Sequence, residues 1–304
     1  MTDSSQALKQ LRRFTRPIRS ILRAGEGHED PEVLTLLSEY STKGVLLSEL
    51  KMEADGQGEE RHTYHYNDQG YLTGHVLELP ADGISERFVT SRDADGRPLR
   101  IIKYYGDDPG EKTEYEYATG AHPVKILRFD ADGEQESLEE LQYDDKDRLL
   151  LRLIIPSGAT GTRYVFSYDD RGLLEVEEEW ENDGELIART VFHYDEEGRD
   201  TLQVKTGADG KVLSRLMFEY DAAGRLLKRT SQGFYTRISA FEYDDVGRVT
   251  EETLSDENGF VITRSQVEYN EDGRVAEETS YETDLTRTGR DTHFLHRYEY
   301  AFYE

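Results

Sequence analysis

The sequence has no cysteine and no long apolar run, and these absences narrow the class of protein. Without cysteine the chain forms neither disulfides nor thiolate metal sites. No apolar run reaches the length of about 18 residues that a transmembrane helix needs, and the basic start lacks the apolar stretch of a secretory signal. We therefore expect a cytoplasmic protein, with export by a dedicated secretion machine left open.

Apolar residues are scarce in general. Hydrophobic residues make up 36% of the chain and charged residues 33%, which is less apolar than a compact globule of this size. The 20 tyrosines nevertheless argue against disorder, because disordered chains are poor in aromatic residues. The composition favours a thin or elongated structure with little two-sided core.

Negative charge dominates, but it is unevenly distributed. The formal net charge is -27, which disfavours nucleic acid as a partner and favours a cationic one. Residues 1–25 carry six basic side chains against Asp3 alone, a charge of +5, so the remaining residues carry −32. The basic side chains are Lys9, Arg12, Arg13, Arg16, Arg19 and Arg23.

What the sequence does contain is an internal repeat. The pattern is Tyr, Asp or Asn, two variable residues, Gly, often Arg, and then an aliphatic residue; residues 220–226 and 243–249 are the best copies. Arg92 replaces the tyrosine in one copy, and Asp147 replaces the glycine in another. The copies begin at positions 40, 66, 92, 117, 143, 168, 194, 220, 243 and 269. Tyr300 opens an eleventh, incomplete unit.

Each unit reads as two strands and two tight turns. Asp or Asn at the first turn accepts hydrogen bonds from the backbone that follows, and Gly takes the left-handed conformation that closes the hairpin. Asp-Gly or Asn-Gly pairs mark a second turn about half a period later. Aromatic or aliphatic residues two positions before most of these tyrosines share their face, which we expect to point inward. We expect Glu175, Glu177, Glu179 and Glu181, around Trp180, on the charged outer face.

The N-terminal segment has a different period. Apolar residues at helical spacing predict a basic amphipathic helix over residues 5–24, kinked or split at Pro17. Three roles stay open: a cap on the repeat array, a docking segment for a partner, and a membrane-surface helix. The predicted domains are a basic amphipathic helical segment over 1–30 and a β-repeat domain of about ten units over 31–304. The candidate partner-binding residues are Arg12, Arg13, Phe14, Arg16, Ile18, Arg19 and Trp180.

The Tyr-Asp-x-x-Gly-Arg copies resemble the YD repeats of RHS-repeat proteins, and the resemblance covers about residues 40–304. In that family, arrays of β-hairpins spiral into hollow shells that enclose a toxin domain, and some members are cell-surface or adhesion proteins. This chain is short and has no recognisable RHS core segment or globular domain after the repeats. The expected fold is therefore an all-β array of antiparallel hairpins. It forms a long curved, spiral or shell-like sheet with a short N-terminal helical segment.

No motif of catalysis or cofactor binding is present, so we expect neither an enzyme nor a cofactor. His62 and His75 can face each other across one hairpin, but a metal site would need a third ligand, and ordinary cross-strand packing is the alternative. Residues 93–96 and 130–133 are similar to fragments of calcium loops. They lack the twelve-residue ligand pattern, and turn chemistry explains them, with weak calcium binding left open.

These observations lead to two hypotheses about function. The first is a non-catalytic protein-binding scaffold or partner-enclosing repeat protein, in a bacterial secretion, toxin or other multi-protein assembly. Its protein partner is cationic or docks on the N-terminal helix; nucleic acid and membrane are not expected. The alternative is a self-assembling structural protein that adds strands at open sheet edges into a filament or homo-oligomer.

Overall fold

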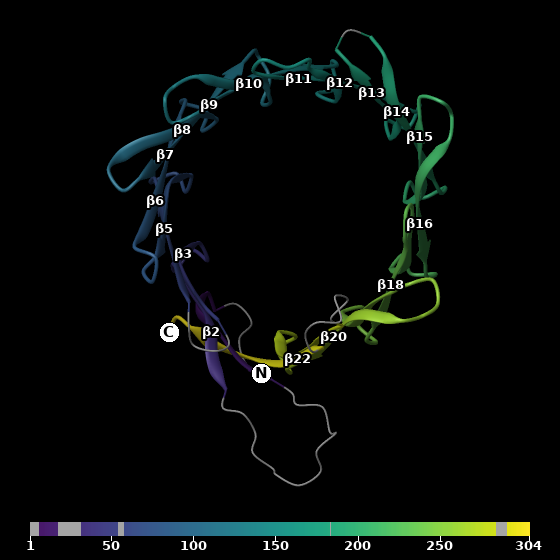
Figure 1. The fold of residues 1–304 in the computed structure, drawn as a ribbon. Coiled ribbons are helices and arrows are strands. Elements are labelled where there is room, and N and C mark those ends of the chain that lie inside the picture. Colours follow the sequence, from purple (N-terminus) through teal and green to yellow (C-terminus); the bar gives the residue numbers. More distant parts are fainter. Residues whose placement is uncertain (1–5, 18–31, 54–57, 183, 284–290) are drawn as a thin grey trace.

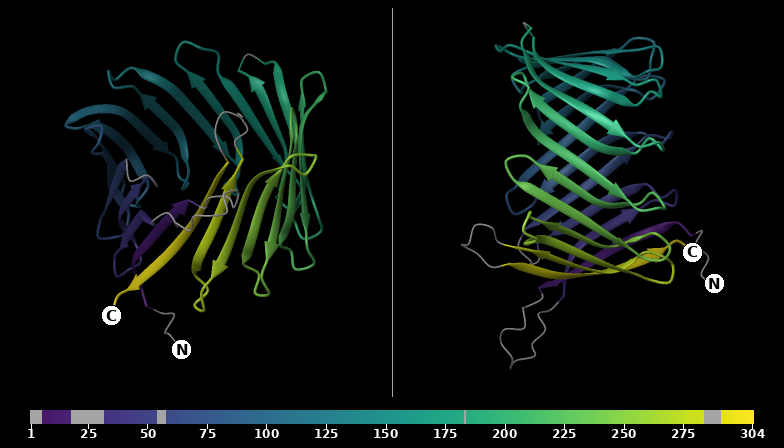
Figure 2. Two further views of the ribbon diagram at one scale, coloured as in Figure 1. Left: turned by 60° about the horizontal axis from the view of Figure 1, so that its bottom comes forward. Right: turned by 90° about the vertical axis from the view of Figure 1, so that its right-hand side faces the viewer.

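The protein is a closed antiparallel barrel of 22 strands. The structure is a computed structural model that describes residues 6–17, 32–53, 58–182, 184–283 and 291–304. Each strand pairs with its neighbours in sequence, and β1 pairs with both β2 and β22. Figure 1 shows the resulting ring, and Figure 2 shows the strands tilted against its axis.

The strands are β1 Leu8–Pro17, β2 Val33–Tyr40, β3 Leu46–Met52, β4 Glu59–Tyr66, β5 Leu72–Leu79, β6 Ile84–Arg92, β7 Pro98–Tyr105, β8 Asp108–Tyr117, β9 Pro123–Phe129, β10 Gln135–Tyr143, β11 Leu149–Pro156, β12 Thr162–Tyr168, β13 Leu174–Glu181, β14 Leu186–Tyr194, β15 Asp200–Gly207, β16 Val212–Tyr220, β17 Leu226–Gln232, β18 Thr236–Tyr243, β19 Val249–Ser255, β20 Val261–Tyr269, β21 Val275–Glu282 and β22 Thr292–Phe302. The described ranges contain no helix, and so none that is long and apolar enough to cross a membrane.

The barrel is too wide to be filled by its own side chains. With strands about 4.8 Å apart and tilted by about 40°, 22 strands give a backbone radius on the order of 20 Å. Side chains project only about 7 Å inward, so they leave an open lumen on the order of 30 Å across. In agreement, Ala188 and Ile262 are the only hydrophobic side chains that are fully buried among the described residues. The fold therefore has no packed core.

The expected spiral sheet and the expected N-terminal helix are both wrong. Residues 8–17 form β1, which lies between the first and last strands of the array and joins them. A strand that pairs on both sides gains hydrogen bonds along two ladders, and this gain overrides the helical spacing of its apolar residues. Pro17, expected to kink a helix, is instead the last residue of the strand. Of the predicted helix, residues 18–24 and residue 5 lie outside the described residues.

A β-bulge next to the first residue of every repeat bends the sheet. In all ten units the register shifts by one residue at this point, as between Glu219 and Tyr220 or between Ser167 and Tyr168. A bulge increases the local twist and curvature of a strand pair. Ten equally spaced bulges therefore impose the same bend on each unit, which is a geometry that closes on itself.

In most units the repeated tyrosine joins the unit to the previous one. Its hydroxyl donates a hydrogen bond to the backbone carbonyl six positions after the preceding repeat residue, as from Tyr220 to Asp200 at 2.9 Å. The same bond recurs from Tyr117, Tyr143, Tyr168, Tyr194, Tyr243, Tyr269 and Tyr300, at 2.7–3.2 Å. Where Arg92 replaces the tyrosine, its guanidinium donates to the equivalent carbonyl of Leu72. We call this contact the tyrosine clasp.

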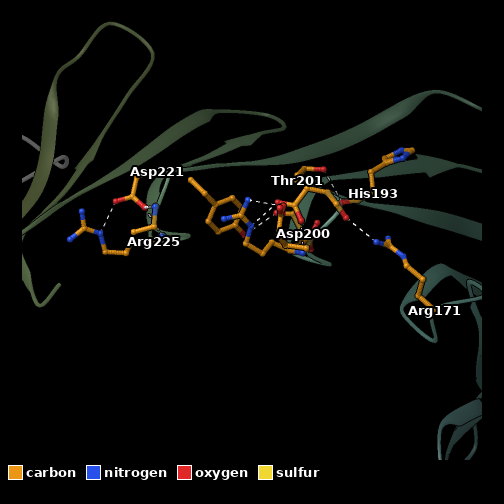
Figure 3. Close-up of polar contacts among 11 residues, drawn as sticks. Arg171, His193, Asp200, Thr201, Asp221 and Arg225 are labelled. Atoms are coloured by element: carbon orange, nitrogen blue, oxygen red, sulfur yellow. Dashed lines mark hydrogen bonds and ion pairs between the residues drawn. The ribbon is translucent and has the colours of Figure 1, made fainter. Parts of the chain in front are cut away.

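The aspartate and arginine of the repeat complete the clasp. Asp221 accepts the backbone N–H groups of Ala223 and Arg225 through Oδ1 and the Arg225 side chain through Oδ2. The Arg225 guanidinium then lies over the ring of Tyr243 in the next unit, 4.8 Å from its centroid. Figure 3 shows the pair of Asp221 and Arg225, together with Arg171, which donates to the next turn at the Asp195 carbonyl. The repeat signature is thus explained by structure alone.

Removing one clasp should destabilise the barrel by a measurable amount. We expect Tyr220→Phe to cost about 1 kcal/mol, because the Asp200 carbonyl loses its hydrogen bond while the ring stays. Urea unfolding followed by circular dichroism measures the change. Tyr235→Phe is the matched control, since the Tyr235 side chain is 65% exposed at a hairpin tip. Equal stabilities of the two variants would contradict the role of the clasp.

One repeat carries avoidable backbone strain. Asp147 occupies the glycine position of its turn with φ 64, the only non-glycine residue at positive φ in the described ranges. We expect Asp147→Gly to stabilise the protein by up to about 1 kcal/mol, since glycine adopts this conformation without steric cost. The ion pair of Asp147 with His122 is exposed and its loss should cost little. An unchanged or lower urea midpoint would show that the turn is not strained.

Candidate functional site: the lumen wall

The two faces of the sheet are distinguished by their exposure. At all ten repeats the residue just before the repeat position is exposed, as His193 and Glu219 are. The repeat residue itself and the residue two positions earlier are never exposed, as with Phe192 and Tyr194. Side chains inside a closed cylinder converge and cover one another, so the less exposed tyrosine face is the face toward the lumen. We call it the lumen face.

A row of aromatic rings follows the lumen face from β12 to β18, about a third of the way around the barrel. Phe166, Phe192, Phe218 and Phe241 occupy the same position in four consecutive units, and all are half-buried. Each lies opposite a long polar side chain on the next strand, at Glu177, Gln203, Arg229 and Glu252 respectively. Residues directly opposite in an antiparallel pair share a face. The lumen wall therefore alternates apolar rings with polar and charged groups.

The expected position of the glutamate run on β13 is wrong. Glu177 and Glu179 lie opposite Phe166 and Tyr164, so they belong to the lumen face and not to the outer face. The reason is the bulge between Ser167 and Tyr168, which shifts the register by one residue and exchanges the faces of the following strand. The sequence alternation alone gives no sign of this exchange.

Many charges on the lumen wall are paired within it. Glu139 has a side chain only 3% exposed and receives hydrogen bonds from Arg128 at 3.1 Å and Arg152 at 2.7 Å. Burial alone would raise the pKa of Glu139, but the two arginines hold it below its usual value. Lys205 pairs with Glu179, and Lys103 with Glu86. The lumen wall therefore contains neutralised acidic and basic pairs, although the chain has a large negative net charge.

The histidine pair expected across one hairpin is present. His62 Nδ1 lies 2.8 Å from His75 Nε2, and the rings are stacked with those of Tyr64 and Phe88 on the lumen face. The second nitrogen of His62 contacts Glu60. Burial lowers the pKa of His75, and the nearby His62 lowers it further. The described residues contain no group of three or more His, Asp or Glu side chains that could hold a metal.

The two calcium-like turns use their carboxylates within the turn. Asp130 Oδ1 accepts the backbone N–H groups of Asp132 and Glu134. Asp93 Oδ1 accepts those of Asp95 and Arg97, and its Oδ2 pairs with the Arg97 guanidinium. Backbone and arginine donors thus occupy both leading carboxylates, as turn chemistry requires.

A chain of polar side chains crosses the lumen face where β1 closes the barrel, and we call it the seam network. Thr35 Oγ1 on β2 lies 2.7 Å from Thr15 Oγ1 on β1, which lies 2.9 Å from His296 Nδ1 on β22. His296 Nε2 continues to Ser280 Oγ on β21 at 3.0 Å. Thr15 and Thr35 are each 3% exposed. Four strands are thus joined by side chains at the point where the two ends of the array meet.

Ionisable groups around the seam network have shifted pKa values. Burial lowers the pKa of His296 below its ordinary value of 6.5, the charge of Arg13 lowers it further, and Glu278 on the paired strand acts in the opposite direction. Burial, followed by the charge of Glu278, raises the pKa of Tyr298 to about 12. Tyr298 donates to Glu278 Oε2 at 3.0 Å. At neutral pH, His296 is therefore uncharged and Tyr298 protonated.

The seam should weaken in mild acid. Because the pKa of His296 is lower in the folded than in the unfolded state, its contribution is fully present above about pH 6.5 and is lost as the pH falls further. Hydrogen exchange of β1 and β22 amides, corrected for intrinsic rates, should show a falling opening free energy from about pH 7.5 to about pH 5.5. In His296→Gln this dependence should vanish. The same dependence in both proteins would assign it to another group.

The candidate partner-binding residues are not brought together. Arg12 is exposed on the outer face, whereas Arg13 points into the lumen and donates to Thr35 Oγ1. Phe14 lies beneath the guanidinium of Arg297, 4.6 Å from its ring centroid. Arg16 lies within β1, and Ile18 and Arg19 fall outside the described residues. None of these residues belongs to a described helix, so the docking helix and the helical cap have no basis in the described residues.

Trp180 lies on the outer wall of β13, across the ring from β1 (Figure 1). It lies opposite Arg163, whose guanidinium is 5.4 Å from the ring centroid of Trp180. The indole N–H and Arg163 Nε have no hydrogen-bond partner. The position of Trp180 therefore leaves its expected role as a partner anchor open but separates it from the basic residues of β1.

Sequence reasoning missed the seam network. Its members are ordinary polar residues: Thr15, Thr35, Ser280 and His296. Two of those in direct contact, Thr15 and His296, are 281 positions apart in the sequence. The one available signal was a break in the pattern: Ser38 stands in the first unit where most other units have an aromatic or large aliphatic residue. That break marks the end of the array, but only the closed sheet shows what lies beside it.

Comparisons with known proteins do not identify the chain. No family model and no curated protein matches it. A porin-like protein from Bacteroides uniformis ATCC 8492 aligns at 12% identity over 97% of this chain and 96% of that chain, with a TM-score of 0.33. The TcdB2-TccC3-Cdc42 structure aligns at 12% identity with a TM-score of 0.29, and TcdB2-TccC3 at 13% with 0.30; each alignment covers 85% of this chain and 20% of that chain. At such TM-scores these likenesses carry no argument about function, and membership of the RHS-repeat family stays a prediction.

Proposed function

We propose that the protein is a non-catalytic scaffold that holds a polypeptide partner inside its lumen. The observation that carries the proposal is the wall itself. An open lumen on the order of 30 Å across has room for a helix or a small domain. Its half-buried phenylalanine rings alternate with charged and amide side chains, which is the mixture that protein-binding surfaces present.

The exposure of apolar surface to water also favours the binding of a polypeptide in the lumen. A sheet whose inner face carries aromatic rings without a packed core leaves apolar surface in contact with water. A polypeptide that covers the rings would remove this surface from water and would meet polar groups at every second strand. The resemblance of the repeats to those of shell-forming proteins is consistent with the same use.

Self-assembly through sheet edges, the alternative expected from the sequence, requires a strand with a free edge. All 22 described strands have a partner on both sides, so the described sheet offers no free edge. Association through the rims or the outer wall would need a different interface.

Photo-crosslinking tests the proposal because adjacent residues face opposite sides. A photoreactive phenylalanine analogue at Phe192 or Phe218 reports on the lumen, and one at His193 or Glu219 reports on the outer wall. In cells that produce the full chain, we expect a discrete polypeptide adduct from the lumen positions alone. Adducts from the outer positions only, or none from any position, would contradict the proposal.

A further inference from the structure

The most exposed aromatic pair of the described residues lies at the tip of the hairpin between β17 and β18. Phe234 is 92% exposed and Tyr235 65% exposed, and they touch only edge to face, with ring centroids 4.7 Å apart. The unit that carries them is the shortest, with 23 residues between Tyr220 and Tyr243. Its turn has Gly-Phe-Tyr where most units have Asp-Gly or Asn-Gly. Neither the fold nor the turn requires these rings.

The adjacent hairpins on the same rim extend this surface. Leu213 is 52% exposed and Phe260 52% exposed, on the hairpins before and after the aromatic tip. A Cβ placed on Gly233 would lie 3.7 Å from the Leu213 carbonyl, so the tip packs beside that hairpin. Figure 1 shows the loops that follow β15 and precede β18 at the outer edge of the ring. We define Leu213, Phe234, Tyr235 and Phe260 as the aromatic rim patch. Clustered exposed rings of this kind mark interaction surfaces rather than scattered exposure.

The segment that contains most of this patch is positively charged, whereas the chain as a whole is negatively charged. Residues 200–241 contain seven basic and four acidic side chains, a formal charge of +3, so all other residues carry −30. Arg237 lies over the ring of Tyr235, 5.3 Å from its centroid, and Arg215 is exposed on the neighbouring strand. Among the described residues neither arginine forms an ion pair with a carboxylate. Arg215 lies on the outer face, whereas Arg237 lies on the lumen face and donates a hydrogen bond to the Thr236 carbonyl, so the two guanidinium groups flank the rim from opposite sides.

From these observations we infer that the aromatic rim patch docks a short acidic segment with apolar side chains, presented by a partner protein. Rings serve as anchors for apolar side chains, and arginine side chains without a carboxylate partner attract the carboxylates of a ligand. The site lies on the rim, where the lumen face and the outer wall meet, with Arg237 on its inner side and Arg215 on its outer side.

Charge selects this occupant over other anionic ones. The Debye length is about 8 Å at physiological salt, so a short segment over the basic sector is screened from most acidic residues of the barrel. A nucleic acid or an anionic bilayer would extend beyond the sector and meet the surrounding charge of −30. A compact acidic peptide is the anionic partner that avoids this repulsion.

Fluorescence anisotropy with a defined probe tests the inference. The probe is a labelled octapeptide that alternates Asp or Glu with Leu or Phe; a Lys-for-acid version and a Ser-for-apolar version are its controls. We expect the full-length protein to bind the probe with a Kd below about 1 mM, the lysine version not at all, and the serine version at least about tenfold more weakly. Binding should weaken as salt is raised.

Variants locate the site. We expect Phe234→Ser with Tyr235→Ser to weaken binding at least about tenfold, and Arg215→Gln with Arg237→Gln to weaken it and reduce its salt dependence. Val246→Ser is the matched control, because Val246 is 75% exposed in the turn between β18 and β19, at the opposite rim. Unchanged thermal unfolding confirms that each variant is folded. No binding by the wild type, equal binding by the rim variants, or preference for single-stranded DNA or anionic vesicles would overturn the inference.

Discussion

Most units of the barrel share one contact, the hydrogen bond from the repeated tyrosine to the backbone of the preceding hairpin. With only two buried hydrophobic side chains among the residues that the structure describes, the barrel cannot rely on a core. Its units are held instead by backbone ladders, and the clasp ties each bulge to its neighbour on the lumen face. Aspartate, glycine and arginine serve the same purpose, since they shape the turn that presents the tyrosine. The regular spacing of the repeat in the sequence is thus the spacing of the tyrosine clasp in the structure.

The sequence predicted the structure of each repeat well and the closing of the barrel by β1 poorly. Period, turn positions and the inward face of the tyrosines follow from local chemistry, and Tyr300 takes the role expected of an eleventh unit. Residues 8–17 were misassigned because their helical spacing is local, whereas the two ladders that make them a strand come from residues far away in sequence. Glu177 and Glu179 were placed on the wrong face because simple alternation along β13 ignores the bulge beside Tyr168, which exchanges the faces of that strand. The seam network around His296 could not be predicted, since closure creates it.

Closure separates two surfaces with different chemistry. The lumen wall carries half-buried rings beside charges that are largely paired, as around Glu139, and suits the enclosure of a polypeptide. The rim around Phe234 carries exposed rings beside two arginines without a carboxylate partner, in a sector whose formal charge is positive. An occupant of the lumen and a partner on the rim would contact largely different side chains. Such a division allows one protein to hold a partner and to be positioned by another.

The closed ring is the central claim, and an engineered disulfide tests it most directly because the chain has no other cysteine. Arg12 on β1 lies opposite Glu299 on β22, and both side chains are exposed on the outer face. Cysteines at these two positions should form an intramolecular disulfide in dilute protein, detected by mass spectrometry and gel mobility, whereas cysteines at Arg12 and Glu219 should not. Free thiols or only intermolecular dimers from the first pair would mean that the ends of the array do not meet.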